Sequence, residues 1–61
     1  MDLMTHNLAE ELYNTYWYTL NKYNKETQPI WSEIVRNSKY KILYDAWLSV
    51  AEKAFDKMLE N

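Results

Sequence analysis

Apolar residues recur every three or four positions through the first third of the chain. They fall at Leu8, Leu12, Tyr16, Leu20 and Tyr23. This spacing draws one stripe along an α-helix, and the opposite side is mostly polar, with Tyr18 as the exception. It predicts a first helix over residues 8–23. Asn7 and Glu10 have the spacing of a capping box, and Asp2 or Thr5 would start the helix a turn earlier.

The only proline separates this helix from a second, shorter one. Pro29 disfavours helix at Gln28 and has no N–H for a helix interior, so the polar segment 24–28 is predicted to be a boundary. Proline is favourable at the first position of a helix. Apolar residues then follow at helical spacing, at Ile30, Trp31, Ile34 and Val35. A helix of about two turns is therefore predicted from Pro29 to Arg36.

A third helix follows a short loop. Asn37 and Ser38 are predicted to form that loop and to supply the next N-cap. The helix has one broad apolar face, made of Tyr40, Leu43, Tyr44, Trp47, Val50, Ala51, Ala54, Phe55 and Met58. Ile42 lies off this face. The chain also lacks glycine, which makes hairpin turns costly. The predicted fold is all-α: one compact three-helix domain over residues 1–61, long, short and long.

The small size of the chain points to a partner. With 61 residues and 7.5 kDa, folding hides only ~60% of the surface that the unfolded chain exposes. Chains this short usually add disulfides, a metal or a partner chain. This one has no cysteine and a single histidine, so a partner chain remains. We therefore expect a homodimer that forms through helix faces.

The missing residue types exclude several chemistries. Without glycine, the chain has no phosphate-binding loop of the kind that nucleotide enzymes use. Without cysteine, it has no thiolate nucleophile and no thiolate-bound zinc or iron–sulfur cluster. We expect no enzymatic activity, no catalytic residue and no cofactor. Residues 1–11 include no apolar run of signal-peptide length, and no stretch is long enough to span a membrane. We expect a cytoplasmic protein without a membrane partner.

Two clusters of charged residues have ordinary interpretations. His6 and Glu10 are four residues apart, which places two metal ligands on one helical face, but only carboxylates could complete the site. A solvated histidine is favoured over a metal site. Arg36, Lys39 and Lys41 form a basic cluster, so the second and third helices could be a helix-turn-helix. The exposed face of the third helix is acidic and repels phosphates, through Asp45, Glu52, Asp56 and Glu60. Nucleic acid is therefore not the expected partner, and a DNA-binding or transcription-regulating module is the alternative function.

Aromatic residues are the main functional signal. The chain has three Trp, six Tyr and one Phe, more than three short helices can enclose together with the leucines. We expect a core that includes Tyr16, Leu20, Trp31, Tyr44, Trp47 and Ala51. The surplus is predicted to form a protein-binding interface, because Trp and Tyr are enriched in binding hot spots. The predicted interface residues are Tyr13, Trp17, Tyr18 and Ile42.

Some of these positions also form a pattern found elsewhere. The pattern is Ala9-Glu10-x-Leu12-Tyr13-x-x-Tyr16, then Trp31-x-x-Ile34, then Ala46-Trp47-x-x-Val50-Ala51. In this pattern the chain resembles small bacteriophage helical proteins, although the interval between its two tryptophans is longer. In size and in its Asn, Tyr and Lys content it also resembles short phage proteins that block bacterial immune systems. The resemblance implies a phage inhibitor of a host defence protein.

Overall fold

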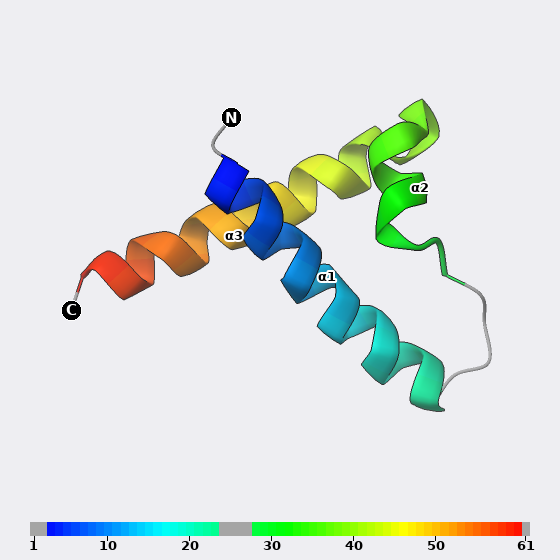
Figure 1. Cartoon of the computed structure of the whole chain (residues 1–61), viewed down its shortest axis with the longest axis horizontal. Coiled ribbons are helices and arrows are strands. Elements are labelled where there is room, and N and C mark those ends of the chain that lie inside the picture. The colour runs from blue at the N-terminus through cyan, green and yellow to red at the C-terminus, as the bar shows by residue number, and fades with distance from the viewer. Residues whose placement is uncertain (1–2, 24–27, 61) are drawn as a thin grey trace.

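The computed structural model describes residues 3–23 and 28–60, and these form three α-helices (Figure 1). Helix α1 runs over Leu3–Tyr23, α2 over Trp31–Arg36 and α3 over Lys41–Leu59, and a 3₁₀ turn, η1, covers Ser38–Tyr40. No strand occurs in the described ranges. The all-α prediction of a long, a short and a long helix is confirmed.

Helix α1 begins more than a turn before the predicted start at residue 8. Asn7 and Glu10 therefore lie inside the helix, and the predicted capping box is wrong. The packing gives the reason, because Thr5 and Ala9 are buried on the side of the helix that faces the core. Thr5 is likewise inside the helix, and the alternative cap, Asp2, lies outside the described residues.

The connection to α2 partly follows the prediction. Helix α1 ends at Tyr23 as predicted, and positions 24–27 of the predicted boundary lie outside the described residues. Pro29 is not the first residue of α2, because Ile30 is the N-cap with extended backbone (φ −77°, ψ 163°). The Ile30 carbonyl accepts hydrogen bonds from the N–H groups of Glu33 and Ile34. The helix thus starts about two residues later than predicted.

Asn37 acts as a cap, as predicted. Its side-chain oxygen accepts a hydrogen bond from the N–H of Lys39 at 3.2 Å. The capped element is η1, which leads directly into α3 at Lys41. The loop predicted at Asn37 and Ser38 is therefore a single extended residue followed by a 3₁₀ turn.

The long helices cross at two alanines. Helix α1 packs mainly on α3, and both Ala9 on α1 and Ala51 on α3 are fully buried. Small side chains at a crossing allow two helix axes to approach closely. In Figure 1 the two ribbons cross near the start of α1 and the middle of α3, with α2 beside the first part of α3.

The core lies next to this crossing and combines aromatic and aliphatic side chains. Its buried residues are Ala9, Tyr13, Trp31, Ile34, Leu48 and Ala51. The predicted core positions Trp31 and Ala51 are confirmed, whereas Leu20, Tyr44 and Trp47 are only half-buried. Tyr16 was predicted to lie inside and is 44% exposed. It is exposed because the distal half of α1, the part beyond Tyr13, extends past the other helices (Figure 1).

The chain exposes more surface than its mass predicts. Its accessible surface is 4914 Å², against ~4,200 Å² for an average folded monomer of this mass. The Cα radius of gyration is 12.4 Å, against ~10.5 Å expected for 61 residues. In Figure 1, α2 lies in one of the two angles between the distal half of α1 and α3, and no described element lies in the other.

Substitutions of alanine by leucine on α3 test whether the two long helices pack closely at Ala51. Ala51→Leu adds volume where the two helices meet, so we expect it to lower the free energy of unfolding by about 1–3 kcal/mol. Ala46→Leu makes the same change at an exposed position of α3 and should change stability by less than about 0.5 kcal/mol. Urea unfolding followed by circular dichroism measures both. Equal stability of the two variants would contradict a close crossing at Ala51.

Candidate protein-binding surface

Tyr13 is the first predicted interface residue, and its predicted exposure is wrong. Its side chain is 1% exposed, and its ring lies against Trp31 and Trp47, with centroids 5.8 and 5.4 Å away. The buried hydroxyl donates a 2.6 Å hydrogen bond to the Pro29 carbonyl. Because this carbonyl satisfies the hydroxyl, a tyrosine can occupy the centre of the core. Tyr13 is therefore not available to a partner.

Trp17 is half-buried and, like Tyr13, donates a hydrogen bond to the segment before α2. Its indole Nε1–H donates to the Gln28 carbonyl at 3.0 Å. Tyr13 and Trp17 are one turn apart on α1 and bind two consecutive carbonyls of the segment that leads into α2. The two side chains thus connect α1 to the entry of α2, so Trp17 contributes to the fold as well as to the surface.

Tyr18 and Ile42 are exposed as predicted. Tyr18 is 71% exposed on α1, and Ile42 is 85% exposed on the first turn of α3. Tyr18 lies beside a shallow depression that Leu8, Leu12 and Thr15 also line. Each side chain keeps its apolar surface in solvent, which suits it to bind a partner.

An apolar groove runs along the distal half of α1, with a volume of about 500 Å³. It is lined by Leu12, Thr15, Tyr16, Thr19, Leu20 and Tyr23 from α1 and by Trp47 from α3. Two of the lining rings, Tyr16 and Trp47, pack against each other with centroids 5.3 Å apart. None of the lining residues carries a charge.

The hydroxyls of the two threonines in the apolar groove are hydrogen-bonded within α1. Thr15 donates to the Glu11 carbonyl at 3.0 Å, and Thr19 donates to the Thr15 carbonyl at 2.9 Å. Burying a polar group is costly mainly when its hydrogen bond to water is not replaced. Because both donors are paired within α1, the groove can lose its water without leaving these hydroxyl protons unpaired.

The sequence interpretation missed this groove by placing Tyr16 and Leu20 in the core. The signal that could have found it is the length of the apolar stripe. The stripe continues to Tyr23, while the predicted second helix has about two turns and cannot cover it. The uncovered end of a long stripe is where an exposed apolar surface should have been expected.

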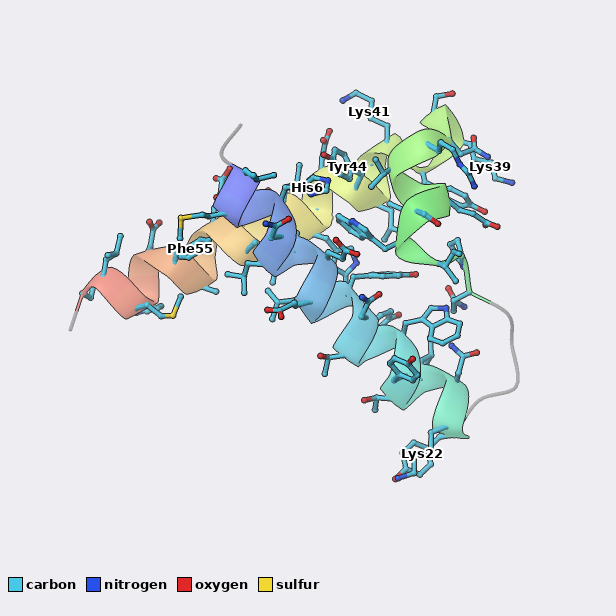
Figure 2. All side chains as sticks on the ribbon, in the orientation of Figure 1. His6, Lys22, Lys39, Lys41, Tyr44 and Phe55 are labelled. Atoms are coloured by element: carbon cyan, nitrogen blue, oxygen red, sulfur yellow. The ribbon has the colours of Figure 1, made fainter. Side chains whose placement is uncertain are left out.

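His6 packs against the core instead of being fully solvated. Its ring lies edge-on to Trp31 and Tyr44, with centroids 5.7 and 5.9 Å away, and Figure 2 shows His6 and Tyr44 close together. The expected solvated histidine is therefore replaced by a half-buried one. Among the described residues, no group of three or more His, Cys, Asp or Glu side chains could hold a metal ion.

The basic cluster is partly neutralised. Lys41 forms a 3.2 Å salt bridge with Asp45, one turn along α3. The Lys39 amine lies 5.0 Å from the centroid of the Tyr40 ring, and Figure 2 shows Lys41 at the start of α3 and Lys39 in the 3₁₀ turn before it. The salt bridge to Asp45 offsets the charge of Lys41 and so weakens the positive field that a nucleic acid would meet.

No family model matches the sequence, and neither the curated proteins nor the solved structures compared with it include a match. None of the described helices combines the length and the apolar content needed to cross a bilayer.

The contribution of the buried Tyr13 hydroxyl to stability is expected to depend on pH. Burial, reinforced by Tyr16 and Tyr40, raises the pKa of Tyr13 above its ordinary value of 10.0. The folded state therefore favours the neutral Tyr13 hydroxyl. The contribution of this hydroxyl to the free energy of unfolding is fully present below about pH 10 and is lost as the pH rises through the pKa of Tyr13 in the folded state. Tyr13→Phe should cost about 0.5–1.5 kcal/mol near neutral pH, because it removes the hydrogen bond to Pro29. Above pH 10 the difference between the variant and the wild type should narrow.

Chemical denaturation at a series of pH values measures this difference. Tyr18→Phe removes a hydroxyl from an exposed ring and is the matched control, with an expected change below about 0.5 kcal/mol. If the difference in the free energy of unfolding between Tyr13→Phe and the wild type stays constant from pH 7 to pH 11, the raised pKa of Tyr13 is contradicted.

Because the basic cluster is small and partly neutralised, we expect that the protein does not bind duplex DNA at physiological salt. Dedicated binders hold non-specific DNA at only ~10⁻⁴–10⁻⁶ M under these conditions, and this chain offers fewer free cations. Fluorescence anisotropy with labelled duplex measures the affinity. Tight binding that is abolished by reversing the charges of Lys39 and Lys41 would favour the DNA-binding alternative.

Proposed function

We propose that the protein is a binding module that acts on another protein and performs no chemistry of its own. The observation that carries this proposal is the uncharged aromatic surface left open on a very small fold. The apolar groove supplies the larger part of that surface, and Tyr18 and Ile42 add two exposed side chains outside the groove lining. Large exposed apolar surfaces on small proteins mark interaction sites.

The chemistry of this surface favours a polypeptide as the ligand. Tyr and Trp provide large contact areas and a polar tip, and they are enriched among residues that dominate binding energy. An anionic membrane is disfavoured, because helices that lie on such membranes carry Lys and Arg on their polar face. The lysines of α3 are accompanied by as many acidic residues, Asp45, Glu52 and Asp56, so its polar face is not basic.

The resemblance to bacteriophage proteins supplies the class of target. In this proposal the protein acts in the cytoplasm of a host cell and inhibits a protein of anti-phage defence by occupying one of its surfaces. Inhibition by occupancy needs no cofactor, and it suits a chain whose main surface feature is a neutral aromatic groove.

The proposal predicts which substitutions weaken target binding. Tyr18→Ala and Ile42→Ser each remove an exposed apolar side chain and should preserve helical circular dichroism. If either residue is a hot spot, the dissociation constant for the target should rise about thirtyfold, equivalent to about 2 kcal/mol. The target is first identified by crosslinking of a tagged chain in host lysate and mass spectrometry, and affinities are then measured by calorimetry.

Ser32→Ala, at an exposed polar position of α2, is the control and should leave the affinity unchanged. Unchanged affinity in both Tyr18→Ala and Ile42→Ser would remove these two residues from the binding surface. Failure of the wild type to bind any host protein specifically would overturn the proposed function.

A further inference from the structure

We propose that the apolar groove is filled by a second copy of this chain, giving a symmetric dimer with the distal halves of α1 at its centre. The inference rests on the proposed function, because it assigns an occupant to part of the same apolar surface. It leaves Tyr18 and Ile42, outside the groove lining, for a different partner.

The surface area is the first argument for a second copy. The chain exposes 4914 Å², about 700 Å² more than the ~4,200 Å² of an average monomer of its mass. A standard protein interface buries ~800 Å² from each partner. Burying this excess in a dimer would restore the surface expected for the mass, and it would supply the stability that a chain without disulfides or metal lacks.

The shape of the chain is the second argument. The angle between the distal half of α1 and the C-terminal half of α3 contains no described element, whereas α2 occupies the angle on the other side (Figure 1). Trp47 on α3 lines the apolar groove together with the residues of α1. At steps of three and four along α3, the same side continues through Val50, Ala54 and Met58, of which Val50 and Met58 are exposed. Both arms of the angle are therefore apolar, as a self-complementary interface requires.

Charge is the third argument. Each copy carries a net charge of −2, so two copies repel unless they meet through a neutral face. The apolar groove has no charged residue. On α3, the helical spacing puts Asp45, Glu52 and Asp56 about half a turn away from Trp47, on the opposite side of the helix. The neutral face is thus the one through which two like-charged copies can approach.

The threonine hydroxyls make the same face suitable for burial. Thr15 and Thr19 turn their hydroxyls to carbonyls of α1, which leaves their methyl groups to contact a partner. Small side chains at these two positions also permit a second helix to come close. In a symmetric dimer each α1 would lie along the apolar groove of the other copy.

The test is the mass of the protein in solution. Sedimentation equilibrium on the full chain should give two chains of 7.5 kDa at micromolar concentration. Thr19→Glu places a carboxylate in the interface of both copies and should raise the dimer dissociation constant at least about tenfold. Ser32→Glu adds the same charge at an exposed position in the first turn of α2, outside the groove lining, and should leave the dimer intact.

A second variant, Tyr23→Ala, tests the interface in case Thr19→Glu does not fold. Tyr23 is 79% exposed at the end of α1, so Tyr23→Ala should keep the helical circular dichroism and still weaken the dimer at least about tenfold. A wild type of single-chain mass at all concentrations up to ~100 μM would overturn the inference, since standard interfaces hold more tightly than this. A dimer unaffected by both Thr19→Glu and Tyr23→Ala would also overturn it.

These outcomes separate the dimer from the proposed function. A folded monomer that binds its target, with the affinity lost in Thr19→Glu, would assign the apolar groove to the target and leave the proposed function standing. A groove-mediated dimer that binds no other protein would support the inference and overturn the proposed function.

Discussion

The hydrogen bond from the Tyr13 hydroxyl to the Pro29 carbonyl determines where the short helix lies. With the parallel bond from Trp17 to Gln28, it holds the entry of α2 against the middle of α1. This position brings Trp31 and Ile34 into the core, because both belong to the helix that starts there. A six-residue helix is too short to be stable alone, so its place in the fold depends on these contacts.

Holding α2 at the middle of α1 has a second effect, which is to leave the distal half of α1 uncovered. One short helix can cover one side of the crossing between α1 and α3, and the chain has no fourth helix among its described residues for the other side. The apolar groove is therefore a direct result of the order long, short, long. The same arrangement that completes the core on one side leaves an uncovered apolar surface on the other.

The fold class was predictable from the sequence, whereas the assignment of core and surface along α1 was not. Spacing of three and four residues, Pro29 and Asn37 predict three helices and their order. The buried residues of α1, however, are Thr5, Ala9 and Tyr13, at steps of four. A line of such steps winds slowly around the helix, because four residues exceed one turn of 3.6. Tyr13 is therefore buried and Tyr16 exposed, the reverse of the prediction. Which of the two tyrosines is buried depends on the crossing angle of the two helices, which is a tertiary property.

The three tryptophans occupy three different environments, and this gives the molecule internal optical reporters. Trp31 is buried in the core, Trp17 donates its indole N–H to the segment before α2, and Trp47 forms part of the wall of the apolar groove. Indole emission depends on the polarity around the ring, so each tryptophan would respond to a separate event: loss of the core, release of α2, or occupation of the groove.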